Sequence, residues 1–409
     1  MVHGGAALTR LADGRVALVR GGLPGEHVEA TLEMRSGVLQ GEVTSVLEAG
    51  PERVPASPHP GLDYSFASYA CQLTLKREVT ADALTRSLKR EVEVPAVIPA
   101  PSAWHYRHTV QPAVATTGTK RGLGYRRPGE QEVVTLPSDP VAHESVNHVW
   151  TDWQNAPKGV PKGIREVVFR CNDAGEVLVA LVASASPKNY LPFAHDLLRR
   201  GLGVVGVSYA SYDPRGRFRS GFERLAGERT LTQRYGEHEV SVSATSFAQP
   251  NPGAASLLYT ELKDWADSGA SALDLYAGTG VIGLHLARQH GRVTALEVDK
   301  SSVVRGERDA KRLGIENLSF IRADAKKLEP LPDADLIVVD PPRAGLAKGV
   351  REAILTSSAT RLLYVSCDVA TWARDVAQFD AAGLTLKRLQ PFDFYPQTHH
   401  IEMLSLLEK

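Results

Sequence analysis

Short apolar runs that predict strands alternate with segments that predict helices along the C-terminal part of the chain. Short apolar runs bounded by polar residues predict five buried strands, at residues 272–274, 292–297, 318–321, 336–340 and 362–366. The segments between these runs predict helices. Strands that alternate with helices are typical of a doubly wound, Rossmann-like α/β domain with a mostly parallel sheet, and we assign this domain to residues 247–409.

The first part of the chain shows β patterns instead. Residues 1–52 contain short strands separated by glycine turns, and Val28, Ala30 and Leu32 alternate onto one face of a strand. This pattern predicts a small β-barrel, which either binds nucleic acid or serves as a structural cap. Residues 53–246 predict a β-rich central domain, which begins with a proline-rich linker and an amphipathic helix near residues 72–92.

The composition is that of an ordinary globular protein. The chain has 409 residues, of which 43% are hydrophobic and 23% charged, and this length predicts two or three domains. No apolar run is long enough to span a bilayer, and the N-terminus lacks the pattern of a signal peptide. We therefore expect a cytoplasmic monomer with no membrane partner.

The charges of the chain balance, because lysine plus arginine and aspartate plus glutamate each total 47. Any RNA binding must therefore come from local patches. Basic residues interleave with aromatic ones in two stretches, which contain Arg107, Lys120, Arg121, Arg126 and Arg127 in the first and Arg215, Arg217, Arg219 and Arg224 in the second. Arginine beside aromatic rings suits phosphate contact and base stacking, but a solvated hairpin surface has the same composition.

The three cysteines, Cys71, Cys171 and Cys367, are far apart, which argues against disulfides and cysteine-rich metal sites. Cys367 follows the predicted strand at residues 362–366, and Asp368 after it is a candidate helix cap. Ligands of open α/β sheets collect at the carboxyl ends of the strands. Cys367 is therefore either a small buried hydrophobe or a thiol at a binding edge.

A glycine-rich segment after the first strand of the α/β domain predicts a nucleotide-type site. Gly278 and Gly280 allow a ligand to approach the backbone closely, and Glu297 ends the next strand, where a carboxylate binds ribose hydroxyls. The acidic Asp274 favours the cationic S-adenosyl-L-methionine over a dinucleotide, whose pyrophosphate it would repel. Asp324 is placed either to bind an adenine amino group or to cap a helix.

Three further motifs follow in the last seventy residues. Asp340-Pro-Pro-Arg-Ala-Gly345 ends the fourth strand, with Arg343 where amino-group methyltransferases carry an aromatic ring and cytosine-C5 enzymes a cysteine. His399 and His400 are adjacent and have no third ligand spaced with them, so we predict no metal site. Glu402 precedes the terminal strand, and this position taken alone makes it a candidate surface carboxylate.

Taken in order, these motifs resemble the RNA 5-methyluridine (uracil-C5) methyltransferase family. The motifs that carry the resemblance are Phe247-Ala-Gln-Pro-Asn251 and residues 274–280, 340–345, 364–367 and 396–402. The segment Gly21-Gly-Leu-Pro-Gly-Glu26 resembles the TRAM domain, an OB-like barrel found on many members, and the stretch around Arg107 and residues 124–127 resembles the family's central RNA-binding domain. The resemblance also implies that the helix near residues 72–92 packs with the catalytic domain.

The resemblance implies a role for individual residues. Cys367 matches the family's nucleophile and Glu402 its general base, and the matched contacts to S-adenosyl-L-methionine are Gln249, Tyr276, Glu297, Asp324 and Asp340. Many relatives carry four cysteines that hold an iron–sulfur cluster near the linker. Of these only Cys71 is present, and Ser57, Ser68 and Asp139 lie near the other positions, so no cluster is expected.

The expected function is methylation of uridine C5 in structured RNA through a covalent bond between Cys367 and C6 of the base. A TRAM-like N-terminus resembles the members that modify 23S ribosomal RNA, so this substrate is preferred, with transfer RNA as the alternative. Two other classes remain, a non-catalytic RNA-binding protein and a dinucleotide-dependent oxidoreductase. The presence of both Cys367 and Glu402 argues against the first, and Asp274 argues against the second.

Overall fold

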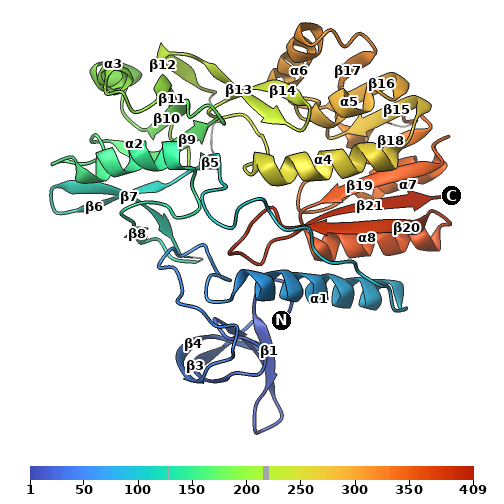
Figure 1. Ribbon diagram of the computed structural model, residues 1–409, viewed down its shortest axis with the longest axis horizontal. Coiled ribbons are helices and arrows are strands. Elements are labelled where there is room, and N and C mark those ends of the chain that lie inside the picture. The colour runs from blue at the N-terminus through green and yellow to red at the C-terminus, as the bar shows by residue number, and fades with distance from the viewer. Residues whose placement is uncertain (128, 215–220, 329) are drawn as a thin grey trace.

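The structure, a computed structural model, describes residues 1–127, 129–214, 221–328 and 330–409 (Figure 1). Its C-terminal part is built on a seven-stranded sheet of order β17-β16-β15-β18-β19-β21-β20. These strands are β15 (Gly269–Leu275), β16 (His290–Glu297), β17 (Leu318–Arg322), β18 (Leu336–Val339), β19 (Arg361–Ser366), β20 (Thr385–Phe392) and β21 (Glu402–Glu408). The five strands from β15 to β19 are parallel, and β21 runs antiparallel to both of its neighbours. The predicted doubly wound α/β fold is thereby confirmed.

Helices cover both faces of this sheet, because successive strand residues point to opposite sides. Ile337 belongs to one hydrophobic core and Val338 to the other. The core that contains Val338 is covered by α4 (Pro252–Ala266), α5 (Val281–Leu286) and α6 (Lys300–Arg312). The opposite core is covered by α7 (Lys348–Thr356), α8 (Val369–Ala381) and α1 (Tyr69–Leu88), which packs against α8 although it is distant in sequence. Asp368 caps α8 as predicted, since its side chain accepts a hydrogen bond from the Thr371 backbone N–H.

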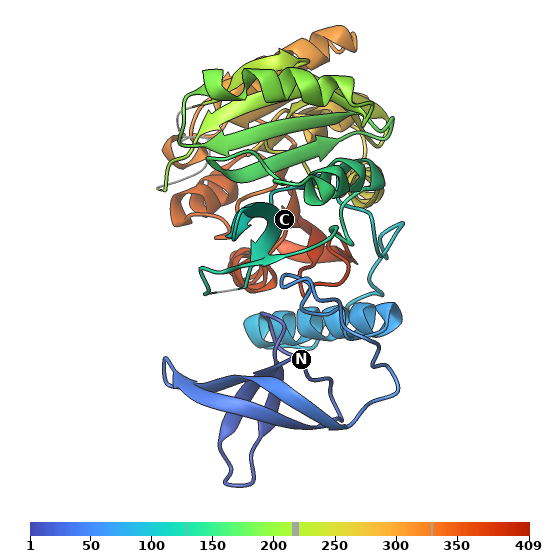
Figure 2. The same ribbon diagram turned by 90° about the vertical axis from the view of Figure 1, so that its left-hand side faces the viewer.

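The N-terminal segment forms a four-stranded sheet with the order β1-β2-β4-β3. Its strands are β1 (Ala7–Arg10), β2 (Val16–Arg20), β3 (His27–Arg35) and β4 (Val38–Glu48). The sheet has a small core around Ala17, Val19 and Leu39. It lies below α1 in Figure 2 and is joined to that helix by an irregular linker.

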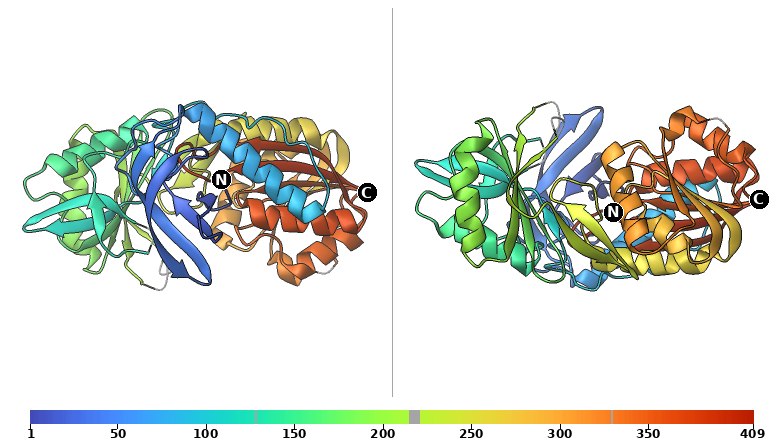
Figure 3. Two further views of the ribbon diagram at one scale, coloured as in Figure 1. Left: turned by 90° about the horizontal axis from the view of Figure 1, so that it is seen from below. Right: turned by 90° about the horizontal axis from the view of Figure 1, so that it is seen from above.

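The central region contains a sheet of order β12-β11-β10-β9-β6-β7-β8, with β5 paired to β9. Its strands are β5 (Thr109–Val110), β6 (Ala113–Thr117), β7 (Lys120–Arg126), β8 (Val133–Thr135), β9 (Ile164–Cys171), β10 (Val177–Ala183), β11 (Val204–Ser211) and β12 (Glu223–Gly227). Side chains of α2 (Glu144–Asn155) and α3 (Leu191–Arg199) complete the core of this sheet. Viewed from above and below, this region and the α/β domain lie side by side (Figure 3).

A hairpin joins the central region to the α/β domain. Its strands, β13 (Thr230–Tyr235) and β14 (His238–Ser243), contact α4, α5 and α6. Leu231 and Val240 of the hairpin therefore lie in the same core as the α/β domain. Among the described residues, no helix combines the length and the apolarity needed to cross a membrane.

Candidate functional site

A cavity of about 1060 Å³ lies where the carboxyl ends of β15, β16, β18 and β19 face the β13–β14 hairpin. This edge includes the point between β15 and β18 where the strand order reverses, at which open α/β sheets bind their ligands. Six of the seven side chains predicted from the sequence line the cavity, namely Gln249, Tyr276, Glu297, Asp340, Cys367 and Glu402.

The seventh predicted residue, Asp324, is not part of this lining. Its side chain accepts a hydrogen bond from the Lys326 backbone N–H and so begins the short helix η2 (Ala325–Lys327). Its negative charge still reaches Tyr276, whose pKa is raised mainly by burial and further by Asp324. The structure thus gives Asp324 the capping role that the sequence left open, and its contact to an adenine stays a prediction.

The glycine loop after β15 forms one wall of the cavity. Tyr276, Gly278 and Gly280 all have positive φ angles, of 64°, 58° and 78°. A Cβ atom at Gly278 would meet nothing within 4 Å, which leaves room for a ligand beside the backbone. The Gly278 N–H donates to Glu297 Oε2 at 2.9 Å, and the Asp299 N–H donates to Glu297 Oε1 at 2.7 Å, so one carboxylate ties together the loops after β15 and β16.

Asp274 lies beneath this loop and not in the cavity. It is fully buried, and its Oδ2 accepts a hydrogen bond from the Gly283 N–H at 3.1 Å, while its Oδ1 has no partner among the described residues. Burial raises the pKa of this carboxyl well above its usual range. Asp274 therefore fixes the first turn of α5 and does not itself line the cavity.

Cys367 and Glu402 lie on another part of the cavity wall. Cys367 follows β19, and Glu402 is the first residue of β21, where it pairs with Phe392. Glu402 is only 1% exposed, so the alternative of a surface carboxylate is wrong, and its Oε2 has no partner among the described residues. A buried acceptor of this kind is costly unless a ligand or a proton satisfies it.

The acidic groups of this wall perturb one another. Burial raises the pKa of Asp340 to about 7, and burial together with the neighbouring Asp340 raises the pKa of Glu402 well above its usual range. Burial, followed by the charges of Glu402 and Asp340, raises the pKa of Cys367 to about 12. Arg343 also lines the cavity and acts in the opposite direction, because its positive charge lowers the pKa of both Cys367 and Glu402.

Tyr395 is a cavity residue that the sequence analysis did not single out. It directly precedes the motif at residues 396–402, and this position is the signal that was available. Burial raises the pKa of its hydroxyl, and Glu402 raises it further, so the phenol lies close to that carboxylate. Arg107 of the central region places its guanidinium carbon 6.0 Å from the centre of the Tyr395 ring.

The other predicted basic residues lie elsewhere. Lys120, Arg126 and Arg127 are exposed on or just after β7, whereas Arg121 is half-buried and its Nε donates to the Val160 carbonyl. In the second stretch Arg224 is exposed on β12, while Arg215, Arg217 and Arg219 lie outside the described residues. Arg107 thus differs from the exposed cations of the first stretch, because it is not exposed and contacts the ring of Tyr395, a cavity residue.

The residues near the linker do not fit an iron–sulfur cluster. Ser68 caps α1 by accepting a hydrogen bond from the Cys71 N–H, and Asp139 accepts one from the Tyr125 hydroxyl at 2.6 Å. Only one of these four positions, Cys71, carries a thiol, and one thiolate cannot hold an iron–sulfur cluster. Within the described ranges, no three histidine, cysteine or acidic side chains come together as candidate metal ligands. His399 instead lies 2.5 Å from Asp63 through its Nδ1.

Known proteins resemble both the sequence and the fold. Residues 232–409 match the family model described as tRNA (Uracil-5-)-methyltransferase. The chain is 31% identical to an "Uncharacterized RNA methyltransferase" of Thermosynechococcus vestitus, over 99% of this chain and 95% of that protein. It is 30% identical to a protein of the same description in Gloeobacter violaceus, over 100% and 95% of the two chains.

Among solved structures, the tRNA (uracil-54, C5)-methyltransferase of Pyrococcus abyssi in complex with S-adenosyl-L-homocysteine superposes with a TM-score of 0.75. The superposition covers 98% of this chain and 99% of that one at 23% identity. At this level of identity the likeness establishes a shared fold over nearly the whole length of both proteins.

Proposed function

The chain belongs to the RNA (uracil-5-)-methyltransferase family, and we propose that it transfers a methyl group from S-adenosyl-L-methionine to carbon 5 of a uridine in structured RNA. The observation that carries this proposal is the meeting of one thiol, Cys367, and one buried carboxylate, Glu402, in the cavity that the glycine loop borders. This reaction needs one nucleophile and one base, and both face the same space.

The residues of the cavity fit S-adenosyl-L-methionine. The open space at Gly278 and the polar side chains of Gln249, Glu297 and Asp340 provide a place for a nucleoside and an amino acid moiety. When bound, this molecule supplies an electrophilic methyl group on a positively charged sulfur. A positive charge in the cavity favours the ionised forms of Asp340, Glu402 and Cys367, whose pKa values are raised without it.

The chain's own residues then carry the covalent steps. The Cys367 thiolate adds to C6 of the uracil, and the electron pair of the C5–C6 double bond moves toward the C4 carbonyl oxygen, which makes C5 nucleophilic. After C5 has gained the methyl group, the Glu402 carboxylate removes the C5 proton. The released electron pair restores the C5–C6 double bond and expels the Cys367 thiolate. Arg343, at the cavity wall, is the candidate donor to the negative oxygen formed during addition.

Two substitutions test this chemistry. Cys367→Ala should abolish methyl transfer and leave the affinity for S-adenosyl-L-methionine intact. Glu402→Gln should still form the bond to C6 but fail to resolve it, so a protein–RNA adduct should survive denaturing electrophoresis. The double variant is the matched control and should form no adduct. Substantial turnover in Cys367→Ala, or normal turnover in Glu402→Gln, would disprove the assignment.

For the substrate, we propose 23S ribosomal RNA, because the N-terminal segment resembles the TRAM domain of members that modify it. Transfer RNA is the second candidate, since the matched family model and the Pyrococcus abyssi enzyme are both named for it. Mass-spectrometric mapping of 5-methyluridine in ribosomal and transfer RNA, from cells with and without the gene, decides between them. The substrate is the RNA that loses a methylated uridine when the gene is deleted.

A further inference from the structure

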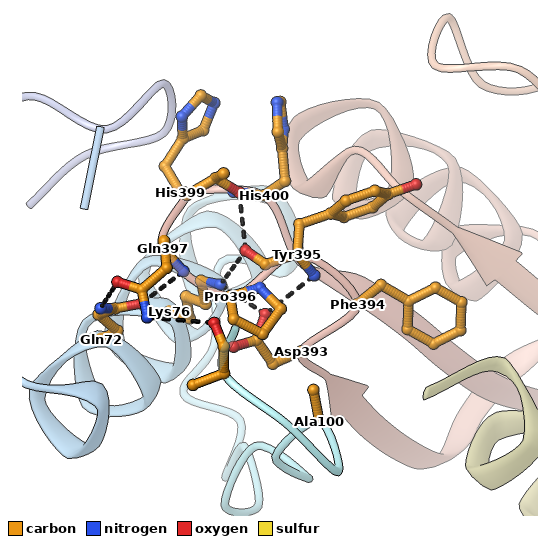
Figure 4. Close-up of polar contacts among 12 residues, drawn as sticks. Gln72, Lys76, Ala100, Asp393, Phe394, Tyr395, Pro396, Gln397, His399 and His400 are labelled. Atoms are coloured by element: carbon orange, nitrogen blue, oxygen red, sulfur yellow. Dashed lines mark hydrogen bonds and ion pairs between the residues drawn. The ribbon is translucent and has the colours of Figure 1, made fainter. Parts of the chain in front are cut away.

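The loop between β20 and β21, residues 393–401, carries Tyr395 to the cavity and ends at Glu402. Helix α1 lies beside this loop, and the Tyr395 ring points away from the helix (Figure 4). The Lys76 Nζ atom donates a hydrogen bond to Asp393 Oδ1 at 2.6 Å and another to the Tyr395 carbonyl at 3.1 Å. Both charged side chains are 0% exposed. A single lysine thus contacts the loop at its first and third residues.

A second contact from the same helix lies one turn away. The Gln397 N–H donates to Gln72 Oε1 at 2.8 Å, and the Gln72 Nε2 donates back to Gln397 Oε1 at 2.9 Å. Gln397 has a φ angle of 69°, a left-handed conformation that non-glycine residues adopt rarely and at a cost in energy. The reciprocal amide pair stabilises the loop in this conformation.

The energetics of the Lys76–Asp393 pair indicate a purpose beyond stability. Burial lowers the pKa of Lys76, and the charge of Asp393 opposes this shift. Removing two charges from water costs several kcal/mol per ion, so well-packed apolar side chains often hold two elements together equally well or better. Unlike apolar packing, a buried pair with two directed hydrogen bonds fixes the loop in one defined position.

We propose that Lys76 and Gln72 are positioning residues for the methyl transfer, because they set the loop that places Glu402 and Tyr395 opposite Cys367. This inference rests on the proposed function. The linkage is short, since Asp393 directly follows Phe392, the residue that pairs with Glu402 across β20 and β21. A shift of about 1 Å in a reacting group can slow a step about 100-fold.

The proposal predicts which step suffers. Cys367 follows β19 and the glycine loop follows β15, and among the described residues α1 makes no hydrogen bond to either. Loosening the loop should therefore slow the step that needs Glu402, the resolution of the adduct, more than its formation. The affinity for S-adenosyl-L-methionine should stay unchanged.

The test uses the full chain with the variants Lys76→Met, Asp393→Asn and the double variant Lys76→Met/Asp393→Asn. Each single change leaves one buried polar partner behind and should lower the Tm, whereas the double change removes the charge of both partners and should restore part of it. In the double variant we expect adduct resolution to be slowed roughly 10- to 100-fold in single turnover, with adduct visible on denaturing gels. The matched control is Arg77→Met, whose guanidinium contacts the Val94 carbonyl and not this loop.

The outcomes separate the inference from the proposed function. A double variant that folds and resolves the adduct at the wild-type rate would overturn the positioning role while leaving the chemistry intact. If the lysine variants fail to fold, Gln72→Leu provides the same test, because it removes the amide pair and keeps the ion pair; normal resolution in that variant also overturns the inference. If the wild-type protein forms no methylated uridine and Glu402→Gln forms no adduct, the proposed function itself is wrong.

Discussion

At the scale of single residues, three weak acids share the cavity wall. Asp340 raises the pKa of both Glu402 and Cys367, Glu402 raises that of Cys367, and burial raises the pKa of all three. In the free protein these groups therefore keep their protons to higher pH than usual, although the proposed chemistry needs a thiolate and a carboxylate. A cationic ligand resolves this conflict, because it stabilises the ionised forms before the reaction starts.

The ionisation of Asp340 predicts a pH dependence of ligand binding. Because the pKa of Asp340 in the free protein is about 7, its carboxyl loses its proton as the pH rises through neutrality. Its attraction for a sulfonium therefore increases from pH 6 to pH 8. We expect calorimetry to show S-adenosyl-L-methionine binding more tightly over this range, with a smaller change for the uncharged sulfur of S-adenosyl-L-homocysteine. Asp340→Asn should remove the difference between the two ligands, and equal slopes in the wild-type protein would contradict the prediction.

At the scale of elements, the position of the glycine loop depends on how closely α6 approaches it. A Cβ atom at Gly306 of α6 would lie 2.7 Å from the Thr279 carbonyl oxygen and 2.4 Å from the Phe320 ring. A Cβ atom at Gly280 would also meet the Phe320 ring, at 2.5 Å. One aromatic residue of β17 thus packs against both glycines and leaves no space for a methyl group at either.

Gly306→Ala should therefore displace the glycine loop. We expect it to destabilise the protein by about 1–3 kcal/mol, as overpacking typically does, and to weaken S-adenosyl-L-methionine binding. Thermal unfolding and calorimetry measure the two effects. The matched control is Gly349→Ala on α7, where a Cβ atom meets nothing within 4 Å, and this change should be neutral or slightly stabilising. Wild-type ligand affinity in Gly306→Ala would show that the loop does not depend on this contact.

At the scale of the whole molecule, the features that could be predicted were those with a local sequence pattern, whereas contacts between residues distant in sequence were not predicted. The alternation of apolar runs was sufficient for the α/β domain, and recognisable motifs were sufficient to bring Cys367 and Glu402 to one cavity. The Lys76–Asp393 pair joins residues 317 positions apart, and no local sequence pattern predicts such a contact. Arg107 was grouped with its sequence neighbours for the same reason, whereas the fold turns it toward Tyr395.

The charge distribution of the whole chain also limits where RNA is held. Residues 1–52 contain four arginines and no lysine against seven acidic residues, so the N-terminal sheet supplies no net positive charge. His3 Nε2 lies 3.3 Å from Asp368 Oδ2, beside Cys367, which brings this segment to the edge of the site. Any contribution of this sheet to RNA binding must therefore come from shape and hydrogen bonds more than from long-range attraction.

Phosphate contacts should come instead from the exposed cations around β7. Each phosphate contact that is lost lowers the slope of log affinity against log salt by about 0.7 to 0.9, so changing Lys120, Arg126 and Arg127 to glutamine should lower it by about two. The control carries the same change at Arg10, Arg15 and Arg35 of the N-terminal sheet, where Arg15 pairs with Asp13 and Arg35 with Glu33. Because two of these three arginines are already paired with a carboxylate, the control should lower the slope less. Filter binding of RNA between 50 and about 200 mM salt measures both, and an unchanged slope in the β7 variant would show that these cations form a solvated face.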